Sequence, residues 1–316
     1  MNNSKKILII RPKYGLCNQL KSISKGIIFA IISNRDIFFD KFQLDYRDEN
    51  NSCDFKEIID INHLQQIILN NNLSVKILES LPNSNQWKKI ITYSNENISM
   101  IKNFIPLLKN NENDSHFFLD IDNPISSDIP NEYEKILQII DLNLKFSDKY
   151  IKIANDIKKQ LNLNNNYISI HLRLEDDALN FIKNIDSNFL LNLVNEVYKE
   201  KYLNAIGEAL CEGMPIYVCT SLSIDNNSNN DFYKEIKDKY KLIDKNNLIN
   251  IDSSKKCDSR EIYGIIDFII AKDAKYFIGC DWSSFSIYLE QHHKNKNNFT
   301  KLIDIYKFFE NLSNHH

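Results

Sequence analysis

The sequence predicts an α/β protein built from two Rossmann-like domains with mainly parallel sheets. Short apolar runs of strand length alternate with longer runs of helical periodicity in both halves of the 316-residue chain. A polar break at Asn164–Asn166 separates the two halves. We therefore expect one domain over residues 1–163 and a second over residues 164–316.

The first half begins with a strand, a turn and a helix. The strand is expected at Lys6–Ile10, the turn contains Gly15, and apolar residues recur at helical spacing over Leu20–Ile32. The free amides of such a turn and the helix N-terminus after it form a natural anion site, although most such turns only connect two elements. Further strands are expected at Asp36–Phe39, Val75–Leu78 and His116–Leu119, and further helices over Phe55–Leu69 and twice between Tyr133 and Leu161.

The second half also alternates strands with helices, and its strands end in polar residues. Strands are expected at Tyr167–Ile170, Met214–Cys219 and Tyr276–Gly279. Helices are expected over Phe189–Leu210, Asp231–Tyr240, Ser259–Ala271, Ser283–Gln291 and Leu302–Leu312. Open sheets of this kind bind ligands at the carboxyl ends of their strands, so the functional residues are expected there.

Composition excludes several classes of protein. A chain with 43% hydrophobic and 26% charged residues is typical of a soluble globular protein, and a formal net charge of −3 does not fit a basic surface for nucleic acid. No stretch approaches the roughly 18 apolar residues of a membrane span. Only 6 glycines occur, and the excess of Asn, Ile and Lys is interpreted as compositional drift, with the Asn clusters read as loops.

Cysteine usage and the start of the chain bear on the compartment. The 6 cysteines are scattered, with no spacing typical of a metal site. The apolar run Ile7–Ile10 is too short for a signal peptide, because Arg11 and Pro12 end it. We therefore expect a reduced, cytoplasmic protein with no metal and no nucleic-acid partner.

Residues Ser169–Asp177 (Ser-Ile-His-Leu-Arg-Leu-Glu-Asp-Asp) carry the first constellation of chemical interest. The predicted strand runs into His171 and Arg173, which strand alternation places on one face. Arginine presents a planar fork of donors that suits a diphosphate. The alternative is an inert ion pair between Arg173 and Glu175 or Asp176 at a solvated strand end.

A second constellation lies between Gly279 and Ser286, where the chain passes from a predicted strand into a helix. Ser283 and Ser284 gather hydroxyls and free amides at one helix N-terminus, an arrangement that suits a phosphate. The alternative is that one of these serines only caps its own helix. Three serines within four residues are more than a cap requires.

Asp267 lies on the helix that precedes this turn, among largely apolar neighbours. A carboxylate in such surroundings needs partners. The ring N–H and the amino group of guanine would supply two donors to one carboxylate. A salt bridge to Lys272 or Arg260 is the other possibility.

Three motifs resemble those of the GDP-fucose-dependent fucosyltransferases. Tyr14–Gln19 (Tyr-Gly-Leu-Cys-Asn-Gln) is similar to their Gly-Gly-x-x-Asn-Gln turn. His171–Asp177 is similar to their His-x-Arg motif, in the form seen in the protein O-fucosyltransferase family. The run from Asp267 to Ser286 resembles that family's C-terminal motif. The motifs occur in the family's order, so the resemblance spans nearly the whole chain.

The resemblance implies a GT-B fold of two facing Rossmann-like domains, with the acceptor on the side of residues 1–163 and the donor held mostly by residues 164–316. It implies an inverting, metal-independent glycosyltransferase that moves fucose from GDP-fucose to a protein Ser/Thr hydroxyl. No cofactor is expected besides this donor substrate. The alternatives are an α-1,2-type fucosyltransferase acting on a glycan, and a catalytically silent relative that binds nucleotide or glycan.

The resemblance also implies two residues at the reacting centre. Arg173 would hold the β-phosphate and stabilise charge on the departing GDP. Asn18 would lie at the mouth of the cleft, near the sugar. The resemblance does not name a general base. Glu175, Asp176 and Asp177 lie nearby in sequence, and Glu175 is taken as the candidate.

The remaining implied residues bind the donor. The resemblance implies that His171 and Asp267 contact the ribose or the guanine. It also includes Gly15, in the turn of the first half. The phosphate and base site would be lined by Ser283, Ser284 and Phe285.

The chain departs from the family in its first turn. Tyr14 stands where the family has a second glycine, and Cys17 occupies a position that is usually small or Asn. Asp120-Ile121-Asp122 also matches an Asp-x-Asp metal motif. We interpret this pair of acids as a strand-end turn, because it lies in the half expected to bind the acceptor.

Overall fold

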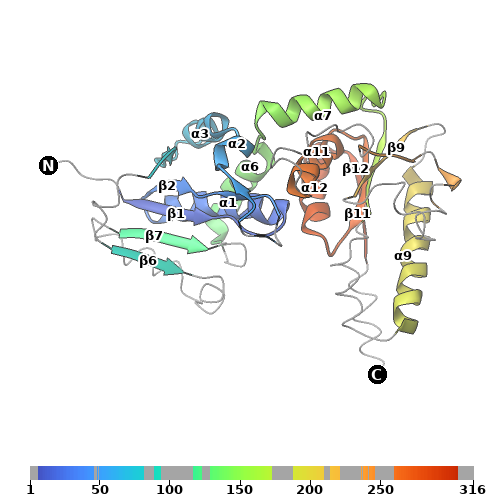
Figure 1. Ribbon diagram of the computed structural model, residues 1–316, viewed down its shortest axis with the longest axis horizontal. Helices are drawn as coiled ribbons and strands as arrows, with labels where there is room; N and C mark the ends of the chain where they lie inside the picture. Colours follow the sequence, from blue (N-terminus) through green and yellow to red (C-terminus); the bar gives the residue numbers. More distant parts are fainter. Residues whose placement is uncertain are drawn as a thin grey trace. The chain divides into compact units, whose positions relative to one another are not determined.

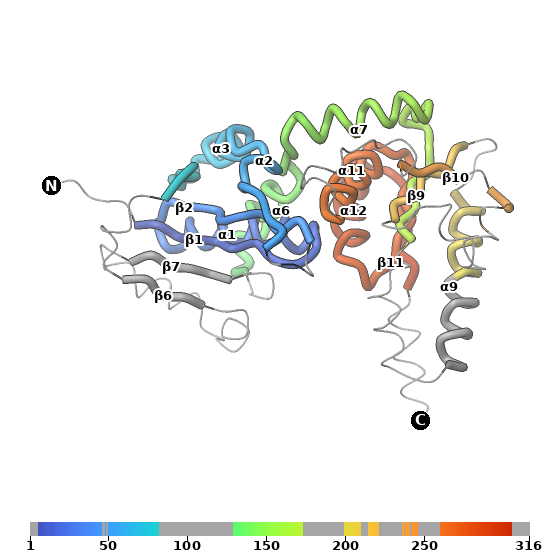
Figure 2. Tube along the Cα trace, in the orientation of Figure 1, coloured from blue at the N-terminus to red at the C-terminus, as the bar shows by residue number. Residues whose placement is uncertain are grey.

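The fold is taken from a computed structural model of the chain (Figures 1 and 2). The structure describes residues 6–45, 48, 50–81, 89–93, 117–122, 129–172, 188–209, 214–220, 236, 238–240, 242–245 and 260–304, with the backbone alone for 89–93, 117–122 and 188–198. Within this described part, no helix is long and apolar enough to cross a membrane.

The chain forms two compact units, Met1–Asp148 and Lys149–His316, and each contains a five-stranded sheet (Figure 1). All but the first residue of α7 (Asp148–Gln160) belongs to the second unit. The polar break at Asn164–Asn166 follows that helix, whereas the units divide at its start.

The first unit is built on a sheet of strand order β5-β2-β1-β7-β6 in which all neighbours are parallel. β1 takes the centre because Ile7, Leu8, Ile9 and Ile10 are all apolar and buried, which suits a strand covered on both faces. The strands are β1 (Ile7–Arg11), β2 (Asp36–Phe39), β5 (Ile77–Leu78), β6 (Lys89–Tyr93) and β7 (Phe117–Asp122).

Helices α1, α2, α3 and α6 accompany this sheet. Their bounds are α1 (Leu16–Ile32), α2 (Phe55–Ile58), α3 (Ile61–Asn70) and α6 (Glu134–Asn143), and the unit also holds a small antiparallel pair, β3 (Phe42–Gln43) and β4 (Ser52–Cys53), and the short 3₁₀ helix η3 (Asn131–Tyr133).

The single helix expected over Phe55–Leu69 is wrong in one respect, because it is divided into α2 and α3. Ile59 leaves the helix to form an antiparallel bridge with Phe146. Asp60 then starts α3 as its N-cap, since its carboxylate accepts a hydrogen bond from the His63 N–H at 2.9 Å. The apolar spacing carries through the break, so periodicity could not show it.

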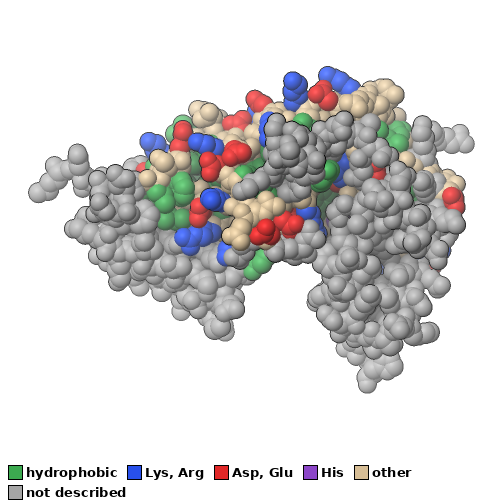
Figure 3. Space-filling model, viewed as in Figure 1, with side chains coloured by type: hydrophobic (Ala, Val, Ile, Leu, Met, Phe, Trp, Pro, Cys, Tyr) green, Lys and Arg blue, Asp and Glu red, His purple; other side chains and the backbone are tan. Residues whose placement is uncertain are grey.

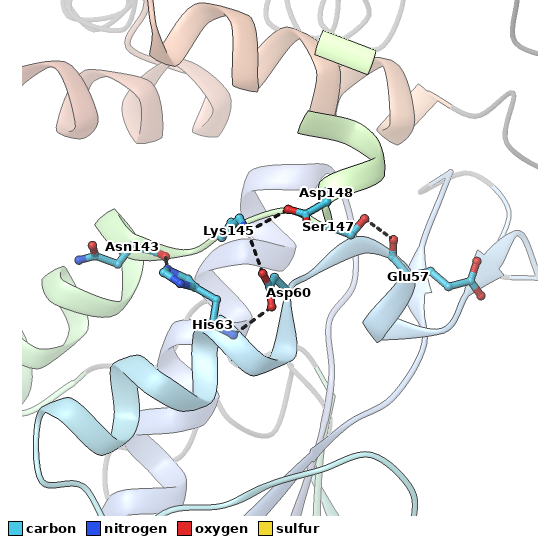
Figure 4. Close-up of polar contacts among 7 residues, drawn as sticks. All are labelled: Glu57, Asp60, His63, Asn143, Lys145, Ser147 and Asp148. Atoms are coloured by element: carbon cyan, nitrogen blue, oxygen red, sulfur yellow. Dashed lines mark hydrogen bonds and ion pairs between the residues drawn. The ribbon is translucent and has the colours of Figure 1, made fainter. Parts of the chain in front are cut away.

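The segment after α6 is fixed to the α2–α3 corner (Figure 4). Lys145 Nζ donates to Asp60 Oδ2 at 3.0 Å and to Asp148 Oδ1 at 2.9 Å. Ser147 Oγ donates to the Glu57 carbonyl at 2.8 Å. These bonds hold the last residues of the first unit against its own helices.

The second unit is built on a sheet of order β10-β9-β8-β11-β12, again with every neighbour parallel. Its strands are β8 (Ile168–His171), β9 (Ile216–Cys219), β10 (Leu242–Ile243), β11 (Tyr276–Cys280) and β12 (Phe299–Ile303). The helix expected over Leu302–Leu312 is wrong at its start, because Leu302 and Ile303 end β12 and pair with β11. Residues 305–312 lie outside the described part.

Helices cover both faces of this second sheet. Figure 1 shows α9 (Asn188–Ala209) on one side and α11 (Arg260–Lys272) with α12 (Ser284–Asn295) on the other. Strand alternation gives the two faces different chemistry. The face toward α9 is apolar, with Ile168, Ile170, Ile216, Val218 and Ile278 packed against Tyr202, Ala205 and Ile206. The residues between them, which face α11 and α12, include Ser169, His171, Tyr217, Cys219 and Gly279.

Four helices end in the same way, with asparagine in the left-handed region. After each of these asparagines, the next N–H bonds back to the carbonyl five residues earlier, which is the Schellman motif that usually contains glycine. The asparagine lies two residues beyond the last helical residue in each case: Asn34 after α1, Asn72 after α3, Asn162 after α7 and Asn297 after α12, with φ values of 50°, 57°, 56° and 56°. The interpretation of the Asn excess as drift is therefore wrong for these residues. They take the place of glycine in a chain that has only 6 glycines.

The described surface carries no broad region of a single charge on the face drawn in Figure 3, where Lys and Arg alternate with Asp and Glu. Several of these charges pair locally, such as Lys158 with Asp273 at 2.8 Å. This pattern agrees with a chain of near-balanced charge.

Candidate functional site

The candidate site lies at the carboxyl edge of the second sheet, on the side of α11 and α12. Because parallel strands all end at one edge, His171 of β8, Cys219 of β9 and Cys280 of β11 fall on the same line. The turn after β11 then leads directly into α12. At this edge, a histidine therefore lies beside the N-terminal turn of a helix.

His171 is fixed by hydrogen bonds from both sides. Its Nδ1 lies 2.8 Å from Ser286 Oγ, and its carbonyl accepts from the Tyr202 hydroxyl at 2.6 Å. Ser286 Oγ also accepts from the Cys280 N–H at 3.1 Å. Ser286 thereby fixes the orientation of the His171 ring.

Gly279 makes this arrangement possible by having no side chain. A Cβ built on Gly279 would overlap the Ser286 hydroxyl and lie 2.7 Å from Ser286 Cβ. Real Cβ atoms do not approach other atoms so closely. The glycine of the predicted strand end is therefore a packing requirement that allows Ser286 to reach His171.

The N-terminus of α12 carries a buried hydroxyl without a partner. Ser283 is the N-cap, it is 1% exposed, and its Oγ caps no backbone N–H and makes no hydrogen bond within the described residues. Ser284 follows as the first helical residue. The free N–H groups and the positive end of the helix dipole make this turn an anion site. A bound anion would give the Ser283 hydroxyl an acceptor, which the described residues do not supply.

Phe285 extends the site with an apolar surface. Its ring lies 4.7 Å from the His171 ring, and it meets the Phe268 ring edge-on at 5.9 Å. Phe285 is half-buried. An imidazole, a benzene ring and a helix N-terminus therefore adjoin one another, which suits a ligand with both a planar ring and a phosphate.

Asp267 belongs to a buried network below this edge. Its Oδ1 accepts from the Tyr217 hydroxyl at 2.7 Å, and its Oδ2 accepts from Lys245 Nζ at 2.6 Å. Lys245 is fully buried and also donates to the Thr220 carbonyl at 3.0 Å. Its ammonium lies 5.5 Å from the centre of the Tyr263 ring.

The ion pair considered from the sequence is not the one that forms, because Asp267 pairs with Lys245 and not with Lys272 or Arg260. Burial raises the pKa of Asp267 from 3.8 to about 6, although Lys245 and the Tyr217 hydroxyl act to lower it. The same burial, with the charge of Asp267, raises the pKa of Tyr217 well above its ordinary value. A contact between Asp267 and guanine stays a prediction.

The first unit carries its own turn, at the carboxyl end of β1. Gly15 is the N-cap of α1, and its carbonyl accepts from the Asn18 and Gln19 N–H groups at 3.0 and 3.2 Å. The side-chain amide of Asn18 is half-exposed and makes no hydrogen bond within the described residues. Both residues are thus placed where a ligand could use them.

Comparison with known proteins decides the family. Residues 7–296 match the family described as GDP-fucose protein O-fucosyltransferase. The chain belongs to this family.

Relatives of the O-fucosyltransferase family agree with this assignment. The chain is 21% identical over 184 residues to O-fucosyltransferase 20 of Arabidopsis thaliana, and 22% identical over 184 residues to the Brassica napus protein of the same name. These matches cover 56% of this chain, and 31% and 32% of the two relatives. The chain thus matches about a third of the length of these plant proteins.

Solved structures of fucosyltransferases share the fold. POFUT1 in complex with GDP is 11% identical, with a TM-score of 0.59 over 96% of this chain and 99% of that one. NodZ alpha-1,6-fucosyltransferase soaked with GDP-fucose is 13% identical, with a TM-score of 0.57 over 91% of this chain and 92% of that one. These likenesses and the two parallel sheets confirm the predicted α/β fold of GT-B type.

Arg173 and Glu175 were expected to be catalytic residues. Both lie outside the described residues. Asp120 and Asp122 are part of β7, so the strand-end turn expected there is wrong. Among the described residues, no group of three or more His, Cys, Asp or Glu side chains could hold a metal ion.

The sequence brought some residues of the site together but missed others. His171, Ser283, Ser284 and Phe285 were expected at one site, and the structure places them along one edge. Lys245 was missed, because one lysine in a lysine-rich chain gives no signal. Ser286 was noted only as part of a serine run, although its spacing of three from Ser283 gave a signal, since it places both on neighbouring turns of one helix.

Proposed function

We propose that this chain transfers fucose from GDP-fucose to an acceptor hydroxyl. The observation that carries the proposal is the buried Ser283 hydroxyl at the N-terminus of α12, which has no partner within the described part of the chain. The same helix bonds His171 through Ser286. Such a turn binds a phosphate, and the family to which the chain belongs is described by its use of GDP-fucose. POFUT1 and NodZ, which share the fold, bear titles that name complexes with GDP or GDP-fucose.

The chemistry requires stabilisation of the departing diphosphate. As the bond from the fucose anomeric carbon to the β-phosphate oxygen breaks, negative charge builds on GDP. Ser283 and the free N–H groups of α12 would donate to phosphate oxygens, and the imidazole of His171 would bind a phosphate oxygen or the ribose. Arg173 would supply the cation, so no divalent metal is needed in this mechanism. The acceptor oxygen bonds to the anomeric carbon from the opposite side and inverts it, and its proton passes to a base for which Glu175 is the candidate.

Protein Ser or Thr is the acceptor that we propose. The family description and the names of the plant relatives both refer to O-fucosyltransferases. A glycan acceptor is the second candidate, because NodZ, of the same fold, is named an alpha-1,6-fucosyltransferase. Transfer from GDP-fucose to peptides, compared with transfer to oligosaccharides, separates the two.

Calorimetric binding without metal tests the donor site. GDP, GDP-fucose, GDP-mannose and UDP would be titrated in EDTA into the wild type, Ser283→Ala and Arg173→Ala. We expect GDP and GDP-fucose to bind, UDP to bind far more weakly, and both variants to weaken the binding of GDP. Equal indifference to all four nucleotides would overturn the proposal. Binding of GDP-fucose without any transfer or hydrolysis would favour the catalytically silent relative.

A further inference from the structure

Tyr14 occupies a backbone conformation that favours glycine. Its φ is 71°, in the left-handed region, where the Cβ of an L-residue crowds the following carbonyl. Asparagine accounts for the other five described non-glycine residues with positive φ. Tyrosine at this position therefore costs conformational energy that glycine or asparagine would avoid.

Gly15, the next residue, is a glycine in a conformation that does not require one. Its φ of −62° and ψ of 159° are available to any residue, and a Cβ built on it would meet nothing within 4 Å. Neither the backbone nor the packing requires a glycine at Gly15. The turn thus has its glycine where the fold does not need one and an aromatic residue where the fold would favour one.

Two buried glutamines hold the strained residue in place. The Tyr14 N–H donates to Gln43 Oε1 at 2.9 Å, and the Tyr14 carbonyl accepts from Gln19 Nε2 at 2.8 Å. Gln19 and Gln43 also bond to each other's chain, since Gln19 Nε2 donates to the Gln43 carbonyl and Gln19 Oε1 accepts from the Gln43 N–H. Gln19 is fully buried and Gln43 is 7% exposed. These bonds fix the backbone of Tyr14, and with it the direction of its Cα–Cβ bond, in advance of any ligand.

The Tyr14 side chain extends from this fixed backbone and is exposed to solvent. Tyr14 is 46% exposed, and within the described part of the chain its phenol makes no hydrogen bond, ion pair or ring contact. A strained backbone conformation at an exposed aromatic residue gives nothing to the stability of the fold. Strain of this kind persists at sites that use it.

We propose that the Tyr14 ring binds the apolar face of a pyranose, stacked against its C–H groups at the carboxyl end of β1. This inference rests on the proposed function, which supplies the fucose of the donor and, with the glycan that is the second candidate acceptor, an acceptor sugar. A tyrosine ring on a fixed backbone has only two side-chain torsions to order, so it binds a flat apolar face at little cost in side-chain entropy. Gly15, the next residue, has no side chain that could cover the ring. The phenol hydroxyl, which has no described partner, is not needed for the stacking.

Four variants test the proposal. Tyr14→Gly and Tyr14→Asn remove the ring and tolerate the left-handed conformation, so both are expected to fold at least as stably as the wild type. Tyr14→Phe keeps the ring. Leu69→Ala removes another exposed apolar side chain, 53% exposed on α3, and serves as the control. The affinities for GDP and GDP-fucose would be measured by calorimetry, and the KM values for donor and acceptor by transfer kinetics.

The outcomes separate the two sugars. If the ring binds the donor fucose, Tyr14→Gly and Tyr14→Asn lose about tenfold in affinity for GDP-fucose but none for GDP, which lacks the sugar. If it binds an acceptor sugar, both variants raise the acceptor KM about tenfold and leave the binding of GDP-fucose unchanged. Tyr14→Phe and Leu69→Ala should match the wild type in each case.

Failure of this inference is distinguishable from failure of the proposed function. If GDP-fucose binds and reacts, and Tyr14→Gly changes neither donor affinity nor acceptor KM, the role of the ring is overturned while the enzyme stands. If neither GDP nor GDP-fucose binds the wild type, the proposed function fails first, and the inference fails with it.

Discussion

Ser286 Oγ lies 2.8 Å from His171 Nδ1, and it reaches that distance by passing over the bare Cα of Gly279. A helix residue thus sets the orientation of a strand-end histidine, across a position that admits no side chain. The orientation of the histidine depends on the turn between β11 and α12. Changes at that turn should therefore alter binding as well as stability.

Gly279→Ala should damage both. The added methyl group overlaps Ser286, so we expect a loss of about 1 to 3 kcal/mol in the free energy of unfolding, together with weaker binding of GDP. Urea denaturation and calorimetry measure the two effects. Gly207→Ala is the control, because a Cβ at that position in α9 meets nothing within 4 Å. It should stabilise the protein by about 0.5 to 1 kcal/mol. Equal behaviour of the two variants would contradict the steric argument.

Ser283→Ala should separate stability from binding. The Ser283 hydroxyl is buried without a hydrogen bond in the described structure, so its removal should leave the free energy of unfolding unchanged or raise it by up to about 1 kcal/mol. The affinity for GDP should fall about tenfold, because a hydrogen bond to a charged phosphate is lost. A variant that is less stable yet binds GDP normally would show that Ser283 is only a structural cap.

Lys245→Met should destabilise the protein in a way that depends on pH. It leaves the Asp267 carboxylate buried without its cation, at a cost of about 3 to 5 kcal/mol near pH 8. Burial already raises the pKa of Asp267 to about 6, and loss of the ammonium raises that pKa further. A carboxyl group with a raised pKa in the folded state favours folding at low pH, and this contribution is lost as pH rises from about 4 through the folded pKa.

The variant should therefore regain stability, relative to the wild type, when the pH is lowered from 8 to 5. Urea denaturation at both pH values measures this change. The double variant Lys245→Met/Asp267→Asn should recover most of the loss at pH 8, because no buried charge remains. If the single variant were equally destabilised at both pH values, the charge of Asp267 would not be the cause.

The asparagine helix ends can be tested at Asn72, which lies after α3. Asn72→Ala must place an alanine at φ 57°, so we expect a loss of about 1 kcal/mol in the free energy of unfolding. Asn72→Gly should equal or exceed the wild type, since glycine adopts this conformation without strain. Thermal and urea unfolding compare the two. An alanine variant as stable as the glycine variant would contradict the explanation that the left-handed conformation disfavours alanine at this position.

The strands that the sequence could predict are mostly those buried on both faces. β1, β8, β9 and β11 are continuous apolar runs, and each was expected within two residues of its observed bounds. The three strands of the main sheets that were not predicted, β6, β10 and β12, all lie at sheet edges. An edge strand buries less apolar surface, so its pattern is weaker. In β12, four of the five residues are partly or fully exposed, and its last two residues, Leu302 and Ile303, were assigned to a helix.

The site was predictable to the extent that it follows from chain order. His171 ends a strand and Ser283 begins a helix, and parallel topology brings such ends to one edge. The pairing of Asp267 with Lys245 could not be predicted, because the two residues are 22 positions apart in the chain and only the fold brings them together. The strain at Tyr14 needs the backbone angle, which composition does not give.

The asparagines at the helix ends also have a consequence for the chemical stability of the protein during storage. Asparagine side chains hydrolyse slowly to aspartate, and the reaction is faster on heating. At Asn34, Asn72, Asn162 or Asn297 the new carboxylate would stand at the carboxyl end of a helix, where the helix dipole already presents negative charge. Repulsion between the new carboxylate and the helix dipole would then destabilise the ends of these four helices. Glycine in their place would be immune to this chemistry, so a preparation stored warm should lose stability as it gains negative charge.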